Sequence, residues 1–289
     1  MSVVTAPSQR IDASAPKAAS AILVVEDIVK RFETPDGVLT AVDHVSLSVA
    51  PGEFVGVIGP SGCGKSTLFN VIGGLLDGYE GTVRVAGERV RGPHAAIGMI
   101  FQEESTFPWR NVLDNVAFPL EIAGLKKAER YERARHFVRL VGLDGFERRY
   151  PAELSGGMRQ RVSMARTLAA QPKILLMDEP FASLDEQTRL LLGDKVLQIQ
   201  QQLKQTTLLI THNITEAVQL SDRVLVMTYR PGTVKRIVEI ELPRPRSSEI
   251  VSSDAFGRYV AQIWNDLREE ASRGLDDEEA RKLREGGSR

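Results

Sequence analysis

The segment from Gly59 to Ser66, Gly-Pro-Ser-Gly-Cys-Gly-Lys-Ser, constrains the fold more than any other part of the sequence. It fits the pattern G-x-x-x-x-G-K-[ST], directly after a strand-like run that ends at Ile58 and before a helical pattern. In that context the glycines let backbone N–H groups turn inward around phosphate oxygens, and the start of the helix adds the positive end of its dipole. An ordinary glycine-rich turn has no need of Lys and Ser in this register. The segment therefore predicts a strand–loop–helix unit that binds the phosphates of a nucleotide.

Individual residues of this phosphate-binding loop have predicted roles. Lys65 is expected to bridge the β- and γ-phosphates, and the hydroxyl of Ser66 is expected to hold Mg²⁺. Cys63, the one cysteine of the chain, has two interpretations that stay open: a reactive thiol shielded by bound nucleotide, or an inert small residue. The predicted nucleotide-binding residues of this segment are Gly59, Pro60, Ser61, Gly62, Cys63, Gly64, Lys65, Ser66 and Thr67.

A second segment, Lys173 to Glu179, has the pattern of a buried strand that ends in two adjacent carboxylates. Asp178 is placed to hold Mg²⁺ through its water shell, and Glu179 is placed to polarise the attacking water. Two adjacent carboxylates at a strand end are costly unless a cation neutralises them, and Mg²⁺ and Lys65 supply that charge. The pair alone would be a weak signal, because Asp-Glu is common on surfaces. Together with the phosphate-binding loop it predicts a site that hydrolyses a nucleotide.

Composition excludes several classes of protein. Lys and Arg total 37 against 38 Asp and Glu, so the formal charge is −1 and no global basic field favours a nucleic-acid partner. A single cysteine rules out an internal disulfide and fits a reducing compartment. The apolar runs, such as Ile174 to Met177, are far shorter than the ~20 residues of a membrane-spanning helix.

The distribution of apolar residues predicts the fold class. Two alternating runs, Val45–Val49 and Thr82–Val85, predict an antiparallel layer at the edge of the fold. A long helical stretch, roughly Val112 to Ala170, predicts an inserted helical subdomain. The predicted class is α/β: a P-loop NTPase core with a mostly parallel sheet, an antiparallel β edge subdomain and an inserted α-helical subdomain. Five runs are apolar on both faces, as in a parallel sheet covered by helices: Phe54–Ile58, Ile97–Phe101, Ile174–Met177, Thr207–Ile210 and Val224–Met227.

The two ends differ from this core. Residues 1–21 are rich in Ala, Ser and Pro and lack the apolar core of a secretory signal, so we expect a disordered tail. A short amphipathic helix is expected where Phe256, Tyr259, Val260, Ile263 and Leu267 recur at helical spacing, either packed on the chain's own core or docking a regulator or partner. Dense mixed charge beyond residue 274 predicts a solvated, frayed end. The expected domains are a tail (1–21), an ATPase domain (22–246, helical subdomain about 103–160) and a C-terminal appendage (247–289).

The segment Leu154 to Arg161, Leu-Ser-Gly-Gly-Met-Arg-Gln-Arg, resembles the signature motif of the ABC transporter ATPases, and the resemblance extends over about residues 23–246. It places a hydroxyl and bare N–H groups at a helix start, which suits an anion, although a plain Ser N-cap is the alternative. The resemblance implies a homodimer in which two copies dock head to tail and each signature closes on the nucleotide of its partner. The residues that it assigns to this contact in trans are Ser155, Gly156, Gly157 and Met158.

Further single residues match functional positions of the family. The resemblance also implies ATP and Mg²⁺ as cofactors. Phe32 matches the aromatic residue that stacks on adenine, although a lone aromatic is more often part of a core. Gln102 matches a glutamine that contacts Mg²⁺ and the attacking water and senses a membrane partner. His212 matches the switch histidine at the γ-phosphate, against the alternative of a structural histidine. Asp185, in Ser183-Leu-Asp185, matches the loop that crosses the dimer interface.

The resemblance therefore implies Glu179, His212 and Gln102 as catalytic residues and Ser66, Gln102 and Asp178 as the metal site. Two departures stand out: Asn213 replaces the usual aspartate after the switch histidine, and Ser183 stands where alanine is usual. Neither removes a catalytic group, so we expect ATP hydrolysis to be intact.

A narrower resemblance is to the branch that serves importers of nitrate, sulfonates, taurine and related small solutes. It implies an ATPase subunit on the cytoplasmic face of the inner membrane, a separate transmembrane permease and a solute-binding protein. The apolar cluster Phe107-Pro-Trp109 beside the helical insert is expected to form a groove for a permease helix, or else to wedge the insert against the core. The segments that carry this resemblance are Gln102-Glu103-Glu104, Phe107-Pro108-Trp109, Met158, Arg230-Pro231-Gly232 and Leu242 to Arg246.

Three other functions remain as alternatives. A soluble ABC-type ATPase acting on nucleic acid, translation or cofactor assembly is disfavoured, because there is no second cassette, no long coiled-coil insert and no basic stripe. The ATPase of an export system is the closer rival, although exporters more often fuse the membrane domain to the ATPase. An unrelated P-loop kinase or GTPase does not explain the signature and the setting of His212. The transported solute is not encoded in this chain.

Overall fold

The computed structural model describes residues 20–286 except 36, 103–104 and 183, with side chains placed as far as residue 274. Residues 1–19 of the predicted tail lie outside the described residues, as do Glu103, Glu104 and Ser183. The division of the chain into tail, ATPase domain and appendage stays a prediction.

A six-stranded sheet forms the centre of the molecule, with strand order β10-β9-β3-β8-β7-β6. Its first five strands in chain order are parallel, and β10 is antiparallel to β9. Every residue of β3, β8 and β9 is buried, because helices cover both faces. The prediction of a mostly parallel sheet from the runs apolar on both faces is thus confirmed. The strands are β3 (Phe54–Ile58), β6 (Ile97–Ile100), β7 (Ile174–Asp178), β8 (Thr206–Ile210), β9 (Arg223–Met227) and β10 (Val234–Glu239).

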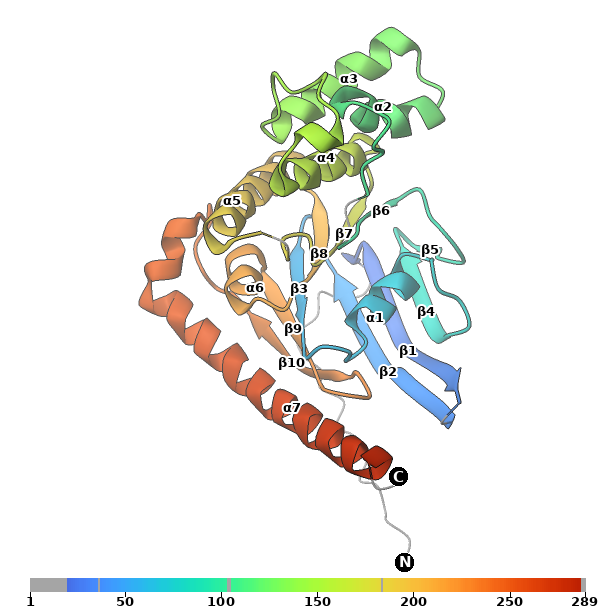
Figure 1. The fold of residues 1–289 in the computed structure, drawn as a ribbon, viewed down its shortest axis with the longest axis vertical. Coiled ribbons are helices and arrows are strands. Elements are labelled where there is room, and N and C mark those ends of the chain that lie inside the picture. Colours follow the sequence, from blue (N-terminus) through green and yellow to red (C-terminus); the bar gives the residue numbers. More distant parts are fainter. Residues whose placement is uncertain (1–19, 36, 103–104, 183, 287–289) are drawn as a thin grey trace, which may run out of the picture.

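A second, antiparallel sheet lies at one side, with strand order β2-β1-β4-β5 (Figure 1). Its buried and exposed residues alternate in the two predicted segments, Val45–Val49 and Thr82–Val85, which confirms the edge layer. Helix α1 (Lys65–Ile72) packs in one apolar cluster with buried residues of both sheets. The helix that follows the phosphate-binding loop is therefore held between the two sheets. The strands are β1 (Leu23–Thr34), β2 (Gly37–Val49), β4 (Glu80–Val85) and β5 (Glu88–Arg89).

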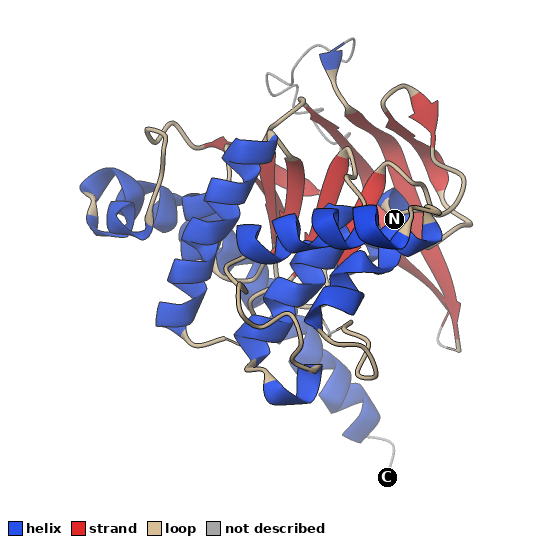
Figure 2. Ribbon diagram, turned by 90° about the horizontal axis from the view of Figure 1, so that it is seen from above, coloured by secondary structure: helices blue, strands red, loops and turns tan. Residues whose placement is uncertain are grey.

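The predicted helical insert consists of three helices and a short 3₁₀ turn, which lie together at the top of Figure 1. They are α2 (Val112–Ile122), α3 (Lys127–Leu140), η2 (Pro151–Glu153) and α4 (Gly156–Ala169). Gly124 and Gly142, both with positive φ, follow the ends of α2 and α3 and divide the helical stretch that the sequence predicts. Helices α5 (Glu186–Leu203) and α6 (Ile214–Leu220) complete the cover of the sheet. Figure 2 shows the strands gathered on one side of the molecule and the helices on the other.

The C-terminal appendage is a 3₁₀ turn, η3 (Ser248–Ser252), and one 33-residue helix, α7 (Asp254–Gly286). The predicted apolar stripe packs with β9, β10 and α6 in a third apolar cluster, so the packing interpretation of the stripe is confirmed. The helix is longer than the predicted short one, and the segment expected to be a frayed end lies within it. None of the helices in the described part of the chain is both long and apolar enough to cross a membrane.

Candidate nucleotide site

A cleft of about 510 Å³ lies where the phosphate-binding loop meets the two sheets. Residues far apart in the sequence reach it: Phe32 from β1, Gln102 after β6 and Glu179 after β7 join the loop. The structure therefore brings together the residues predicted for adenine, phosphate and attacking water. The lining residues are Phe32, Leu39, Ala41, Ser61, Gly62, Gly64, Lys65, Ser66, Thr67, Gln102, Glu179 and Arg230.

The phosphate-binding loop connects β3 to α1 and is held by its own lysine. Buried Lys65 donates from Nζ to the carbonyls of Gly59 at 2.8 Å and Pro60 at 2.9 Å. Gly64, with φ 102°, precedes α1, and a Cβ there would collide with the carbonyl of Ala41. No side chain caps the N-terminus of α1. Its first N–H groups thus remain for an anion.

Cys63 is fully buried inside the loop. Burial raises the pKa of its thiol, and the nearby Lys65 offsets this only in part. Its Sγ packs against Gly59, where a Cβ would come within 2.8 Å of the sulfur. A buried thiol with a raised pKa carries little thiolate, so the inert interpretation is the one that the geometry favours.

Two of the predicted metal-binding residues, Ser66 and Asp178, meet at the end of β7, and the third, Gln102, lines the cleft together with Ser66. Burial raises the pKa of Asp178, while a hydrogen bond with Ser66 acts in the opposite direction. The Asp178 Oδ1 atom is buried and has no hydrogen-bond partner among the described residues. An orphaned carboxylate oxygen beside a hydroxyl suits a hard cation such as Mg²⁺, which keeps water and phosphate oxygens as further ligands. The residues present therefore fit Mg²⁺.

Glu179 and His212 stand together at the ends of neighbouring strands β7 and β8. The Nδ1 atom of His212 lies 3.1 Å from Glu179 Oε2, and the Glu179 amide N–H donates to the carbonyl of Ile210 at 2.9 Å. Glu179 has φ 45°, a conformation that costs energy in a non-glycine residue. Strain of this kind, next to the hydrogen bond between Glu179 and His212 at the cleft, is typical of catalytic positions.

The departure at Asn213 has a structural explanation. Asn213 is the N-cap of α6, and its side chain accepts a hydrogen bond from the amide N–H of Glu216 at 3.0 Å. Asn and Asp serve equally well as N-caps, so the substitution preserves the start of the helix.

Glu216 is a buried residue of α6 whose perturbed ionisation the sequence did not predict. Burial raises the pKa of its carboxyl to about 7, against the opposing effects of the Thr211 hydroxyl and Arg189. Its Oε1 atom has no hydrogen-bond partner among the described residues. The sequence showed Glu216 only as a neighbour of His212, because burial of a glutamate on a seven-residue helix leaves no signal in the pattern.

Phe32 is half-buried in the β1–β2 hairpin and pairs across it with Leu39. The ammonium of Lys30 lies 4.9 Å from its ring centroid. Phe32, Leu39 and Ala41 form an apolar wall of the cleft at the edge of the phosphate-binding loop. Phe32 therefore lines the cleft and does not occupy the core position that was its alternative.

The signature segment stands outside this cleft. Ser155 is the N-cap of α4, and its hydroxyl accepts from the amide N–H of Met158 at 3.3 Å. Asp185 caps α5 by accepting from the amide N–H of Thr188, which lowers the pKa of its carboxyl. Of the residues that line the described cleft, none comes from these two segments. Within one chain, the structure does not bring the signature and the nucleotide cleft together.

Arg230 lines the cleft but was not predicted as a site residue. Its Nε donates to the carbonyl of Gly62 in the phosphate-binding loop at 2.9 Å. The two residues are 168 positions apart in the sequence. The segment around Arg230 carried only a family resemblance, since its contact with the loop depends on how the β9–β10 hairpin folds back.

Comparisons with known proteins agree with this geometry. The family model described as ABC transporter matches residues 42–182. An uncharacterised ABC transporter ATP-binding protein of Methanocaldococcus jannaschii is 49% identical over 88% of this chain and 94% of its own length. The nitrate import ATP-binding protein of Synechocystis sp. is 42% identical (85% of this chain, 95% of its own), and an aliphatic sulfonates import ATP-binding protein of Bacillus cereus is 41% identical (82% and 94%).

Solved structures give the same result for the fold. A dimeric ATP-binding cassette in a post-hydrolysis state, bound to ADP and Pi, superposes with a TM-score of 0.67 at 29% identity. That match covers 76% of this chain and all of the other. A cassette of the cbiONQ transporter from Clostridium perfringens matches with a TM-score of 0.70 at 25% identity, over 83% of this chain and 94% of the other.

The raised pKa of Glu216 makes stability depend on pH. Between the ordinary value of 4.5 and about 7, the unfolded carboxyl loses its proton while the folded one keeps it, so the folded state loses stability as pH rises. The variant Glu216→Gln keeps an acceptor for the Thr211 hydroxyl and cannot ionise. We expect its stability relative to wild type to rise across this window, by up to about 3 kcal/mol. Urea unfolding at several pH values measures this difference.

The control for this experiment is Glu132→Gln, which removes the same charge from an exposed position on α3. Its unfolding free energy should follow that of wild type at every pH. Parallel curves for Glu216→Gln and wild type would contradict the raised pKa.

Proposed function

The chain belongs to the ABC transporter family of ATP-binding proteins, and we propose that it powers an importer of small nitrate- or sulfonate-like solutes through a separate permease. Family membership rests on relatives up to 49% identical over 88% of the chain, and it makes the protein an ATPase that drives transport. The observation that carries the proposal is the cleft, in which the phosphate-binding loop faces Glu179 and Gln102. The solute class is supported by the import relatives for nitrate and aliphatic sulfonates.

We place ATP with its phosphates on residues 59–67 and its adenine on the apolar wall that includes Phe32. Support comes from the free N-terminus of α1, from Lys65 and from the half-exposed ring of Phe32 within the same cleft. The ammonium of Lys65 is buried and hydrogen-bonded to neutral carbonyls. A bound phosphate would offer it stronger, charge-assisted hydrogen bonds. Electrostatic attraction between the phosphates and the loop therefore dominates the binding of the triphosphate.

Mg²⁺ would be held by Ser66, Asp178 and Gln102. When bound, it would neutralise negative charge that develops on the phosphate oxygens. The orphaned Oδ1 of Asp178 supports this assignment.

The carboxylate of Glu179 orients and polarises the attacking water and accepts its proton. The imidazole of His212, 3.1 Å away, holds this carboxylate in position and stands where it can contact the γ-phosphate. The glutamate is attached to a buried strand on one side and to the Ile210 carbonyl on the other, so little reorganisation accompanies the reaction.

We propose that two copies of the chain form the working unit, docked head to tail. Ser155, Gly156, Gly157 and Met158 then bind the γ-phosphate side of the partner's nucleotide, and Asp185 lies at the interface. Their position outside the cleft of their own chain supports this arrangement. A solved relative at 29% identity is described as a dimeric ATP-binding cassette with ADP and Pi.

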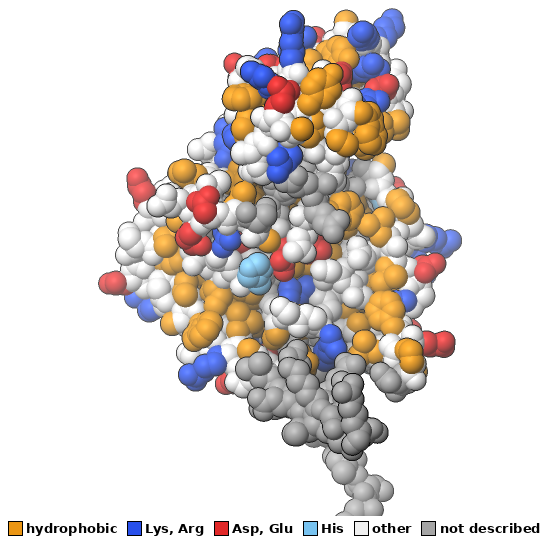
Figure 3. Space-filling model, in the orientation of Figure 1, with side chains coloured by type: hydrophobic (Ala, Val, Ile, Leu, Met, Phe, Trp, Pro, Cys, Tyr) orange, Lys and Arg blue, Asp and Glu red, His pale blue; other side chains and the backbone are white. Residues whose placement is uncertain are grey.

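The helical insert is the proposed docking site for the permease. Phe107 stacks on Trp109 at 5.5 Å, meets Phe118 edge-on at 4.8 Å and lies under the guanidinium of Arg166 at 4.7 Å. Phe107 thus packs the insert against the neighbouring helices, whereas Trp109 is 72% exposed and available to a partner. In Figure 3 hydrophobic side chains lie among charged side chains of both signs over the helical insert, at the top of the view. Exposed Ile122, at 73%, belongs to the same insert.

We further propose that the protein acts peripherally, on the cytoplasmic face of the inner membrane. A solute-binding protein on the far side of the membrane belongs to the same proposal, and nucleic acid does not. The proposed division is an ATPase domain over residues 22–246, with a helical subdomain at about 103–160 and an appendage from 247.

Glu179→Gln should keep nucleotide affinity and lower kcat by about 10²–10⁴, the usual worth of a general base. Lys65→Ala should instead weaken nucleotide binding itself, because the loop loses its cation. Equilibrium binding of a fluorescent ADP analogue and steady-state phosphate release measure the two effects. A Glu179→Gln protein that turns over at nearly the wild-type rate would remove this residue from the role of base.

Trp109→Ala should keep basal ATPase activity and lose affinity for the permease. Trp264→Ala is the matched control, since Trp264 is 57% exposed but lies on α7, outside the insert. Co-purification of each variant with the permease in detergent measures the effect. Equal recovery of permease by both variants would end the assignment of Trp109 to the docking surface.

The decisive test is recovery of tagged Glu179→Gln protein with ATP from detergent-solubilised native membranes, read by mass spectrometry. We expect a multi-span permease in stoichiometric amounts together with a solute-binding protein. A permease of an export system would move the protein to that class. Recovery of soluble partners alone, from protein that dimerises normally on ATP, would favour a soluble ABC-type ATPase.

A further inference from the structure

The loop that joins β9 to β10, residues 228–233, contacts three separate parts of the molecule. The hydroxyl of Thr228 closes this 228–233 loop by donating to the carbonyl of Pro231 at 2.8 Å and accepting from the amide N–H of Thr233 at 2.9 Å. From this closed turn, one residue reaches the phosphate-binding loop, another reaches β2 and a third reaches α7. Such a turn can transmit the position of one part to another.

The first contact is with the phosphate-binding loop. Arg230 donates from Nε to the carbonyl of Gly62 at 2.9 Å. A peptide group is planar, so holding this carbonyl also sets the direction of the next N–H, that of Cys63. Gly62 and Gly64 both have positive φ, and glycine crosses easily between conformations. Within the loop, Lys65 binds the carbonyl of Pro60, and the Cys63 N–H donates to the same carbonyl at 3.3 Å. Arg230 adds a contact from outside the loop that fixes the other side of the Gly62–Cys63 peptide group.

The second contact is with the wall of the cleft formed by β2. The amide N–H of Gly232 donates to the carbonyl of Ala41 at 3.1 Å, and the amide N–H of Asp43 donates to the carbonyl of Gly232 at 3.0 Å. A Cβ at Gly232 would collide with the carbonyl of Cys63. The 228–233 loop thus lies directly against both the phosphate-binding loop and a residue that lines the cleft.

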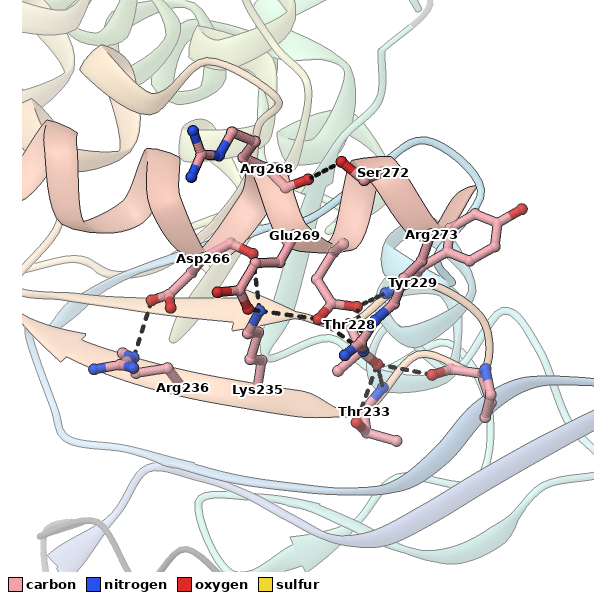
Figure 4. Close-up of polar contacts among 12 residues, drawn as sticks. Thr228, Tyr229, Thr233, Lys235, Arg236, Asp266, Arg268, Glu269, Ser272 and Arg273 are labelled. Atoms are coloured by element: carbon pink, nitrogen blue, oxygen red, sulfur yellow. Dashed lines mark hydrogen bonds and ion pairs between the residues drawn. The ribbon is translucent and has the colours of Figure 1, made fainter. Parts of the chain in front are cut away.

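The third contact is with α7, from which Asp266 and Glu269 point toward Arg236 and Lys235 (Figure 4). Glu270 of the same helix is buried. Its Oε2 accepts the amide N–H of Tyr229 at 2.9 Å, and its Oε1 pairs with Lys235 at 2.9 Å and with Arg273 at 3.2 Å. A Cβ at Gly274 would come within 3.0 Å of the ring of Tyr229, so helix and loop are in close contact. Breaking a buried, paired carboxylate away from its partners is costly, which makes this a firm attachment.

We propose that Arg230 is a positioning residue of the nucleotide site and that Glu270 of the C-terminal helix holds it there, so that nucleotide affinity depends on the docking of α7. The inference deepens the nucleotide site proposed above and rests on it. The chain of contacts runs from Glu270 through the Tyr229 amide to Arg230, and from Arg230 to the carbonyl of Gly62.

The effect should appear in binding and not in the chemical step. Glu179 and His212 follow β7 and β8, whereas the 228–233 loop follows β9. Its contacts among the described residues are with the phosphate-binding loop, β2 and α7. The apolar stripe around Phe256 and Ile263 keeps the first half of α7 in place independently of Glu270. A variant at Glu270 therefore loosens the 228–233 loop without undocking the whole helix.

The test compares Arg230→Ala, Glu270→Ala and Glu269→Ala as full-length proteins. Glu269 is the matched control: it is 63% exposed, adjacent to Glu270 and also paired with Lys235, at 2.6 Å, but it makes no contact with Tyr229 among the described contacts. Binding of a fluorescent ADP analogue, and KM and kcat for ATP, are measured for each. Thermal unfolding midpoints show whether a variant has lost its fold.

We expect Arg230→Ala and Glu270→Ala each to weaken nucleotide binding and to raise KM by about tenfold, the effect of one charge-assisted hydrogen bond, with little change in kcat. Glu269→Ala should match wild type. Because both residues act through one contact chain, the double variant should be no weaker than either single variant. Additive losses would overturn the link between the two residues.

Lys65→Ala separates failure of this inference from failure of the site. If Lys65→Ala loses nucleotide and Arg230→Ala does not, the positioning role is wrong and the site stands. If Lys65→Ala also binds normally, the proposed site itself is wrong. Arg230 is exposed, so its variant should fold even if Glu270→Ala does not, and normal affinity in a folded Arg230→Ala protein overturns the proposal by itself.

Discussion

The buried ammonium of Lys65, held by carbonyls of its own loop, is the interaction on which the rest of the site depends. The hydrogen-bond partners that the described residues offer it are neutral: the carbonyls of Gly59 and Pro60 and the thiol of Cys63. A buried charge whose hydrogen bonds all go to neutral groups is costly, and the Asp178 carboxylate compensates it only through space. A triphosphate adds negative charge that can accept hydrogen bonds from the ammonium directly. The loop is thus preorganised for an anion, and it is less stable when no anion is bound.

Strand order brings the chemistry to this loop. In the central sheet β3 lies next to β8, and β8 lies next to β7, although helices separate these strands in the sequence. The carboxyl ends of parallel strands lie at one edge, so the loop after β3, Glu179 after β7 and His212 after β8 meet there. The positive φ of Glu179 is the local cost of turning its carboxylate toward the cleft.

Local patterns predicted most of this arrangement, because the buried strands and the phosphate-binding loop are recognisable within a few residues. Arg230 was not predicted as a site residue, since its contact with Gly62 spans 168 positions and depends on tertiary folding. The burial of Glu216 could not be predicted either, because α6 is too short to show a clear periodic pattern in the sequence. The segment beyond residue 274 was predicted as frayed because its charges are dense and mixed, whereas the structure continues α7 to Gly286.

The two halves of α7 are attached to the rest of the molecule by different interactions. Phe256 and Ile263 bury apolar surface, which responds little to charge or salt, whereas the second half is attached through ion pairs of Lys235 and Arg236. Among these pairs the carboxylate of Glu270 is buried and also binds the Tyr229 amide. Leaving that carboxylate unpaired is costly, so the helix and the 228–233 loop must stay together or separate together.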